Sequence, residues 1–237
     1  MLSLERQNYW REQYRQRRPG WQPATELYAD LVRANLPANG RLLDIGCGRG
    51  GLVEQLHHPL EQTVGVDPDW LSLHEHRLDL PRAAALGHHL PLAANQFDVA
   101  VASWVLEHLP DPAADFREIG RVLRPGGRLV FITPNKRHPL IELNRGLAKF
   151  RFVQERVVSG FYGRAAADTF PAYYRANTAV DLQRLCAQAG LTLTRLHVVA
   201  DPTYLVFHLA LFGPLCRWEE WLEKERGVHL VGVAAKF

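Results

Sequence analysis

One nine-residue stretch constrains this chain more than any other. Residues 42–50 read Leu-Leu-Asp-Ile-Gly-Cys-Gly-Arg-Gly, an apolar strand with a carboxylate near its end that leads into a glycine-rich turn. Glycine is needed where the backbone adopts positive φ or comes within contact distance of a ligand, because a Cβ there would clash. The alternate glycines Gly46, Gly48 and Gly50 therefore predict a turn whose backbone closely approaches a nucleotide-like ligand.

Two classes of ligand fit this turn. Taken as Gly46, Gly48 and Gly51, it matches the dinucleotide fingerprint, which expects an acidic residue about 20 positions later for a ribose. Asp67 meets that expectation for either ligand. Asp44 separates the two ligands, because a carboxylate there would repel a pyrophosphate and attract a cation. S-adenosylmethionine is favoured, since it offers a sulfonium and an ammonium to Asp44, a ribose diol to Asp67, and no phosphate.

Further segments follow the turn in a recognisable order. They are Leu90-Pro91 with Phe97–Val101, Glu107-His108, and the run Glu118–Gly127 that ends in Arg-Val-Leu-Arg-Pro-Gly-Gly. In these segments and in the glycine turn, the chain resembles the class I S-adenosylmethionine-dependent methyltransferases. The resemblance is continuous over about residues 38–135 and looser over 178–200 and 228–237.

The alternation of strand and helix patterns predicts an α/β fold with a parallel sheet. The resemblance implies a Rossmann-like sheet of seven strands, mostly parallel with an antiparallel last strand, helices on both faces and an inserted helical lid. The strands are expected at 41–46, 62–67, 82–86, 97–102, 127–133, 191–199 and 228–236. Helices are expected at 5–17, 23–36 and 111–123, the last capped by Asp111, and from Thr178 to Gly190.

A length of 237 residues fits a single domain of this class. We expect that domain to span 1–237 in four parts. The parts are N-terminal helices (1–37), a cofactor-binding half (38–135), a lid over the acceptor (134–177), and a C-terminal part (178–237) with an apolar helix at 203–224.

The ligand site is expected beyond the carboxyl ends of the strands, where ligands bind to open α/β sheets. The expected cofactor-binding residues are Asp44, Gly46, Cys47, Gly48 and Gly50 after the first strand, Asp67 and Pro68 after the second, Gly87 and His88 after the third, and Ser103 and Trp104 after the fourth. Cys47 is expected there for its small size rather than as a nucleophile. The chain departs from the family pattern at Leu86, where an acidic residue often accepts from the adenine amino group, so backbone of Gly87 or His88 is the expected substitute.

Methyl transfer is an in-line displacement, so holding the acceptor close and aligned can supply most of the acceleration. A base is needed only if the acceptor must lose a proton. His108 is the candidate base because imidazole can take a proton near neutral pH. Glu107 would orient that imidazole or face solvent, and Tyr173 is a second candidate. The alternative is that His108 only packs against or caps the next helix.

Residues 134–177 form an unusually long connection of 44 residues, where such connections usually have about 2 to 6. Eight Lys and Arg against three Asp and Glu give it a net charge of +5, and aromatic residues are interleaved with the basic ones. This composition indicates a lid over an acceptor with an apolar or aromatic body and an anionic group. The expected contacts are Tyr162, Phe170, Tyr174 and Arg175. A helical hairpin with a solvated basic face is the alternative.

Composition limits the partners. Three well-separated cysteines indicate free thiols, and no leader segment is apparent, so the cytoplasm is the expected location. A net charge of +3 is too small for a nucleic-acid footprint. His74, His76, His88 and His89 lack a cysteine or a regularly spaced carboxylate to complete a metal site, so none is expected. The apolar run at 204–216 is too short to span a bilayer and indicates a buried or dimer-forming helix, with an interfacial helix as the alternative.

The function expected from these residues is methyl transfer from S-adenosylmethionine to a small molecule, at oxygen. Three alternatives stay open, which are a lipid-like acceptor at a membrane surface, a non-catalytic cofactor-binding scaffold, and an NAD-dependent oxidoreductase. The last is disfavoured by Asp44. A monomer and a homodimer are both compatible with the sequence.

Overall fold

The computed structural model describes residues 4–148, 170–204 and 209–237, and in it the chain divides into two compact units. The sheet unit consists of Thr25–Thr133, Ala172–His197 and Val231–Phe237. The helical unit consists of the described residues of Met1–Ala24, Pro134–Pro171 and Val198–Leu230. The sequence patterns gave no sign that these last three stretches would gather into one unit. The single-domain organisation stays a prediction.

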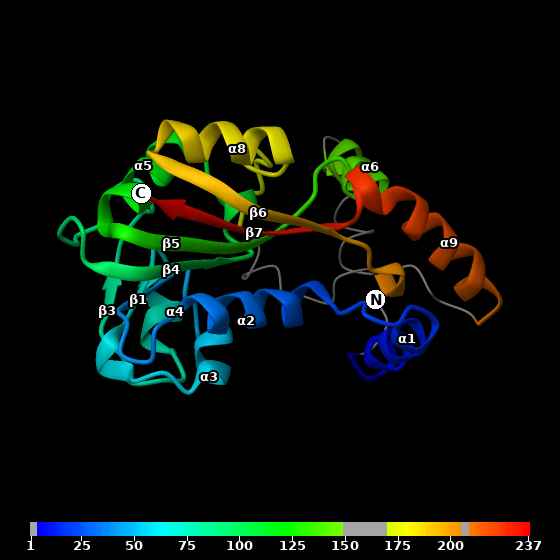
Figure 1. The fold of residues 1–237 in the computed structure, drawn as a ribbon, viewed down its shortest axis with the longest axis horizontal. Helices are drawn as coiled ribbons and strands as arrows, with labels where there is room; N and C mark the ends of the chain where they lie inside the picture. Colours follow the sequence, from blue (N-terminus) through cyan, green and yellow to red (C-terminus); the bar gives the residue numbers. More distant parts are fainter. Residues whose placement is uncertain (1–3, 149–169, 205–208) are drawn as a thin grey trace. The chain divides into compact units, whose positions relative to one another are not determined.

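A seven-stranded sheet with the order β3-β2-β1-β4-β5-β7-β6 forms the centre of the sheet unit (Figure 1). The strands are β1 (Leu42–Ile45), β2 (Thr63–Asp67), β3 (Arg82–Ala84), β4 (Phe97–Ser103), β5 (Leu123–Pro134), β6 (Leu191–Val199) and β7 (His229–Lys236). The first five pair in parallel, and β7 runs against its neighbours. The α/β fold, the strand number and the antiparallel last strand are therefore confirmed.

Two strand boundaries were predicted wrongly. β5 starts at Leu123 rather than at residue 127, because Leu123 already has extended backbone and pairs with Phe97. The ladder is then interrupted by a bulge before Val99 pairs with Arg128, so the expected Pro-Gly-Gly stop lies inside the strand. β3 ends at Ala84 rather than at residue 86.

The helices of the sheet unit that begin at Ala24, Pro112 and Ala179 lie where the sequence predicts them, whereas those that begin at Leu52 and Trp70 were not predicted. They are α2 (Ala24–Asn35), α3 (Leu52–Leu56), α4 (Trp70–His74), α5 (Pro112–Val122) and α8 (Ala179–Gln188), with short 3-10 turns η1 (Leu60–Gln62) and η2 (Leu106–His108). Asp111 caps α5 by accepting from the Ala114 N–H at 3.2 Å, and Thr178 caps α8 by accepting from the Asp181 N–H at 3.0 Å. α5 and α8 pack together on one face of the sheet and α2 covers the other (Figure 1).

The core of this unit lies along its two central strands. Four consecutive residues of β4 (Val99–Ala102) and four of β5 (Leu129–Ile132) are fully buried. Phe116 and Ile119 of α5 cover them with the apolar stripe that the sequence predicts. Burial of this apolar area fixes the central strands and therefore the positions of the loops that follow them.

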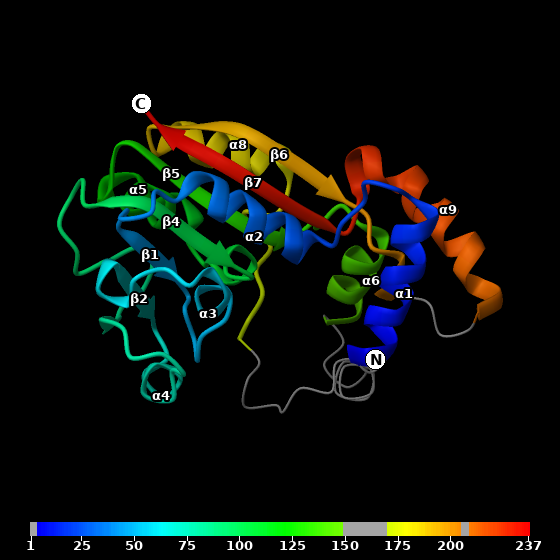
Figure 2. The same cartoon turned by 60° about the horizontal axis from the view of Figure 1, so that its bottom comes forward.

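The helical unit is built from α1 (Leu4–Arg17), α6 (Pro139–Ala148), α9 (Leu209–Arg226) and the 3-10 turn η4 (Pro202–Tyr204) (Figure 2). Tyr14, Trp21 and Cys216 form its buried apolar cluster, and the Trp10 and Phe212 rings stack with centroids 5.0 Å apart.

The predicted apolar helix at 203–224 corresponds to η4 and α9, with residues 205–208 outside the described part. α9 buries Cys216 and Leu222 but exposes Leu211 and Trp221, so its role in a dimer or at an interface stays a prediction. None of the described helices combines the length and the apolar composition needed to cross a bilayer.

Candidate functional site

The glycine turn after β1 has the tight geometry that its sequence predicts. Gly46 has φ +69°, and a Cβ there would overlap Cγ2 of Val105, from the loop after β4. The N–H groups of Gly46 and Cys47 both donate to the Val66 carbonyl, at 2.8 and 3.1 Å. Position 46 therefore requires glycine on two counts, and the turn is tied to the end of β2.

Gly48 keeps the outer side of this turn open, whereas a Cβ at Gly50 would lie 2.7 Å from Glu54 Oε1. Gly48 has φ +50°, and a Cβ there would meet no atom within 4 Å among the described residues. Gly50 has φ +110°. Both glycines are needed for their backbone conformation, and the space above Gly48 lets a ligand lie directly on the peptide.

Asp67, at the end of β2, holds its carboxylate in a fixed orientation. Oδ2 accepts from the Gly48 N–H at 2.9 Å and Oδ1 from the Asp69 N–H at 2.8 Å. Each carboxylate oxygen has a second lone pair, so both can also accept from a diol. The side chain is nearly buried and faces the turn through these bonds. Its geometry fits the predicted ribose contact.

Asp44 is a buried carboxylate that the protein leaves without a hydrogen bond from any residue the structure describes. It is 7% exposed, and burial, with a smaller effect of Asp67, raises its pKa to about 7. The Tyr28 hydroxyl of α2 is also buried and has no hydrogen-bond partner in the described part of the chain. Burial and the charge of Asp44 raise the pKa of this hydroxyl well above its usual value. Such a carboxylate fits a cationic ligand, which would supply the missing countercharge. No sequence signal distinguished Tyr28.

Cys47 has the properties of an inert thiol. Its sulfur packs against Gly65, where a Cβ would lie 2.8 Å from it. Burial and the charges of Asp44 and Asp67 raise the pKa of the thiol to about 12. The side chain is therefore neutral near pH 7 and is used for packing.

The loop after β3 adjoins Asp67. The Ala85 N–H donates to the Asp67 carbonyl at 3.1 Å, and a turn closes from Leu86 to His89. Leu86 is 53% exposed, whereas Gly87 packs against Asp115 of α5. Pro68, which directly follows Asp67, is exposed. The predicted cofactor residues after β2 and β3 are thus near one another, and the neighbouring Asp115 was missed.

The loop after β4 is strained and well anchored. Trp104 follows the half-buried Ser103 and has φ +58°, which is uncommon for a bulky residue. Its N–H donates to the Ile132 carbonyl at 3.0 Å. Backbone strain of this kind gathers at functional sites, where surrounding packing maintains it. His108 ends this loop half-buried in η2, and its N–H donates to the Val105 carbonyl.

Glu107 is buried, which excludes the alternative that it faces solvent. Thr133 Oγ1 donates to Glu107 Oε2 at 3.1 Å, and Asn177 Nδ2 donates to Thr133 Oγ1 at 2.7 Å. This chain of side chains connects the loop after β4, the end of β5 and the residue before the α8 cap. Neither Thr133 nor Asn177 was identified from the sequence.

Three of the predicted acceptor-side residues come together at the loop after β4. The N–H groups of Tyr173 and Tyr174 donate to the Glu107 carbonyl at 2.7 and 3.1 Å. Arg175 donates to the Pro110 carbonyl, and its guanidinium lies 5.5 Å above the Tyr173 ring. The fourth, Phe170, is exposed and belongs to the helical unit, and Tyr162 lies outside the described residues.

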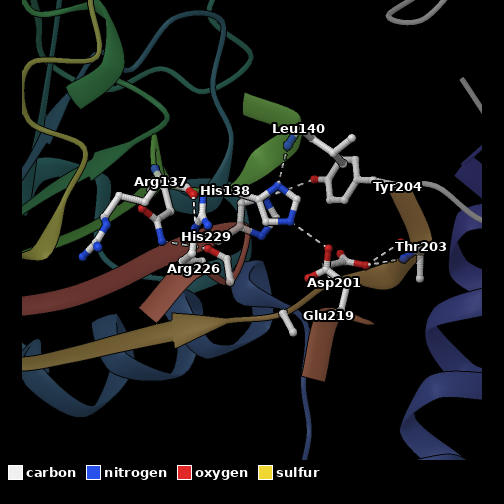
Figure 3. A network of polar contacts seen from close by, with 12 residues as sticks. Arg137, His138, Leu140, Asp201, Thr203, Tyr204, Glu219, Arg226 and His229 are labelled. Carbon is white, nitrogen blue, oxygen red and sulfur yellow. Dashed lines mark hydrogen bonds and ion pairs between the residues drawn. The ribbon is translucent and has the colours of Figure 1, made fainter. Parts of the chain in front are cut away.

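The helical unit contains a buried polar network that the sequence did not predict (Figure 3). The Leu140 N–H donates to His138 Nδ1 at 3.2 Å, so Nε2 carries the proton and donates to Glu219 Oε1 at 2.8 Å. Tyr204 and His229 interact through the hydroxyl and Nε2 at 3.3 Å. Burial, with smaller effects of nearby positive groups, lowers the pKa of His229 to about 3. His229 is therefore neutral throughout the physiological range.

No group of three or more His, Cys, Asp or Glu side chains is placed to hold a metal ion in the described part of the chain. The candidate site combines the buried carboxylates of Asp44 and Asp67 with an open glycine turn at the carboxyl edge of one sheet.

Comparison with known proteins identifies the family to which the chain belongs. Residues 13–196 match the model of a methyltransferase domain. The ubiquinone biosynthesis O-methyltransferase of Aeromonas salmonicida is 37% identical over 42% of this chain and 44% of that protein. The protein of the same name from Aromatoleum aromaticum is 29% identical over 67% of each. The chain spans about half the length of most of the curated relatives that it matches.

A solved structure with a similar fold is the geranyl diphosphate C-methyltransferase of Streptomyces coelicolor, in complex with Mg²⁺, geranyl diphosphate and S-adenosyl-L-homocysteine. Its TM-score is 0.60 at 15% identity, and the alignment covers 90% of this chain and 77% of that one. At this identity the likeness is one of fold.

Proposed function

Because this chain belongs to the methyltransferase-domain family, whose model covers residues 13–196, we propose that it transfers the methyl group of S-adenosylmethionine to an oxygen atom of a small molecule. The proposed acceptor has an apolar or aromatic body and an anionic group. The observation that carries the proposal is Asp44, a buried carboxylate without a hydrogen bond from the described residues, next to the glycine turn. A phosphate-bearing cofactor would be repelled there, whereas a cationic one is attracted.

Asp44 and Asp67 would hold the cofactor by different means. Asp44 supplies the negative charge for the sulfonium and ammonium groups. Asp67, fixed by the Gly48 and Asp69 N–H groups, accepts from the ribose hydroxyls. When bound, S-adenosylmethionine supplies a methyl carbon already activated by its leaving group. The protein then needs to align the acceptor and exclude water.

His108 is the proposed base for a hydroxyl acceptor. It ends η2, in the same loop whose Glu107 carbonyl accepts from Tyr173 and Tyr174. An imidazole in this loop can take the hydroxyl proton as the oxygen attacks the methyl carbon. Arg175, held by the Pro110 carbonyl, is the proposed partner of the anionic group. Two of the relatives above are named O-methyltransferases, which supports oxygen as the methylated atom.

The proposal is tested with S-adenosylmethionine labelled in its methyl group and pairs of phenols with and without a carboxylate. We expect transfer to the hydroxyl oxygen, a decrease in kcat of about 100-fold or more in His108→Ala, and loss of the corresponding limb of the pH profile. In Arg175→Ala, KM should rise about tenfold for the carboxylated phenols and little for the neutral ones. Asp30→Ala, at an exposed position of α2, is the control.

This assay, combined with titration of S-adenosylmethionine and NADH, separates the alternatives. Cofactor binding without transfer to any acceptor in the panel would favour the scaffold function over the enzymatic one. Transfer to carbon or nitrogen alone would contradict the assignment to oxygen. Binding of NADH instead of S-adenosylmethionine would contradict the methyltransferase function itself.

A further inference from the structure

Asp115 is a buried carboxylate with one oxygen that has no hydrogen-bond partner among the described residues. It lies in the first turn of α5, is 2% exposed, and its Oδ2 has no hydrogen-bond partner among the residues that the structure describes. Burial, opposed by His88, raises its pKa to about 6. Burying a carboxylate without partners is unfavourable, so such a group in a native structure calls for a ligand or a function.

Gly87 packs directly against this carboxylate. A Cβ at Gly87 would lie 2.5 Å from Asp115 Oδ1. The φ of Gly87 lies outside the left-handed range that favours glycine, so its φ would admit other residues. A side chain at position 87 would therefore have to displace the Asp115 carboxylate. His88 Nδ1 is 3.9 Å from Oδ1, beyond hydrogen-bond distance, and the His88 side chain is 40% exposed.

The loop that contacts Asp115 follows β3, next to the expected ribose contact. Asp67 pairs with Ala84 in the sheet register, and the Ala85 N–H donates to the Asp67 carbonyl. A base attached to a ribose on Asp67 would extend along this loop. Leu86, which stands where the family pattern has an acid for the adenine amino group, is 53% exposed and offers no side-chain acceptor.

We propose that Asp115 accepts a hydrogen bond from the exocyclic amine of the cofactor's adenine, replacing the carboxylate that Leu86 does not provide. The inference rests on the proposed function, because it places S-adenosylmethionine at this edge of the sheet. Since His88 Nδ1 lies 3.9 Å from Asp115 Oδ1, the base would take the place of the His88 side chain beside this carboxylate. A carboxylate accepts from an amine and repels a carbonyl oxygen, so Asp115 would select adenine against hypoxanthine.

The test compares the binding of S-adenosylhomocysteine with that of S-inosylhomocysteine, in which a carbonyl oxygen replaces the amine. Wild type should prefer the adenine ligand by at least about 100-fold, because a buried acceptor would face that carbonyl. In Asp115→Asn, whose amide can donate to the carbonyl, the ratio should fall to about threefold or invert. Asp79→Asn, which removes an exposed carboxylate of the same unit, should keep the wild-type ratio.

A second experiment places an acidic residue at position 86. Leu86→Asp in the Asp115→Asn background should return the preference for adenine toward that of wild type, since position 86 is exposed and tolerates a carboxylate. If Asp115 served only as an ion-pair partner of His88, the Asp115→Asn ratio would stay at the wild-type value.

The outcomes distinguish the inference from the function it rests on. Equal affinity of wild type for the two ligands overturns the inference without any variant, as does an unchanged ratio in a folded Asp115→Asn protein. If neither ligand binds to wild type, the proposed function itself fails. Binding of both ligands with a ratio that depends on Asp115 supports the two together.

Discussion

The carboxyl edge of the sheet and the buried network of the helical unit fix their carboxylates in different ways. At the sheet edge, Asp67 is oriented by two backbone N–H groups, and Asp44 receives no hydrogen bond from the residues described. In the helical unit, Glu219 is paired with His138, and Asp201 with Thr203 and Arg11. Backbone N–H groups orient Asp67, and both edge carboxylates keep capacity for a ligand. In the network, side chains contact both Asp201 oxygens and Glu219 Oε1, while Glu219 Oε2 is buried without a partner among the described residues.

This difference predicts which property each region controls. Changes at the sheet edge should mainly weaken ligand binding. Changes in the network should mainly lower the free energy of unfolding, because removing one partner leaves the other buried and unpaired. The following experiments are arranged from the largest expected effect to the smallest.

Gly46→Ala should produce the largest loss. Its Cβ would overlap Val105 in addition to straining a residue with φ +69°, so the turn must shift, and we expect cofactor affinity to fall by about 100-fold or more. Gly126→Ala is the matched control, because Gly126 has φ +80° but a Cβ there would meet nothing within 4 Å among the described residues. Calorimetric titration and melting of both variants check this. Equal losses in the two would show that strain alone matters.

Glu219→Ala should destabilise the protein by about 3 kcal/mol, because the His138 N–H would be left buried without its acceptor. Glu219→Gln keeps an amide oxygen for His138 and should lose less. Denaturant unfolding measures both variants, and titration with S-adenosylhomocysteine should give near wild-type affinity in each. A selective loss of cofactor affinity with unchanged stability would contradict the distinction between the two regions.

The affinity for S-adenosylmethionine should depend on pH through Asp44. Its pKa of about 7 means that the carboxylate is ionised above pH 7 and protonated below it. Because the cation binds to the ionised form, affinity should be highest above pH 7 and about tenfold weaker at pH 6. Asp44→Asn should bind weakly with little pH dependence over this range. A wild-type affinity that rises as the pH falls would refute this role for Asp44.

Local sequence patterns predicted much of the sheet edge. The positive φ of Gly46 and Gly48 follows from glycine spacing, and the caps Asp111 and Thr178 follow from residues next to apolar stripes. Asp67 could be located because it ends an apolar strand. The glycine conformations, the two helix caps and the position of Asp67 all depend on residues that are close together in the sequence, so local patterns can predict them.

The parts that escaped prediction depend on contacts between distant segments. His138 and Glu219 are 81 positions apart, and neither stands in a recognisable motif. The fit of Asp115 to Gly87 likewise arises only when α5 packs beside the loop after β3. The early start of β5 reflects pairing of Leu123 with Phe97 across a bulge. Tertiary pairing overrode the Pro-Gly-Gly signal there, as it commonly overrides local propensity.

The central claim is that the carboxyl edge of the sheet binds S-adenosylmethionine through Asp67 and the glycine turn. Calorimetric titration of wild type and Asp67→Ala with S-adenosylmethionine, S-adenosylhomocysteine and NADH tests it most directly. We predict that wild type binds the two sulfur compounds and not NADH, and that Asp67→Ala weakens both by about 100-fold, the loss of two hydrogen bonds to a charged group. Absence of binding to wild type, or equal binding to the variant, would contradict the claim.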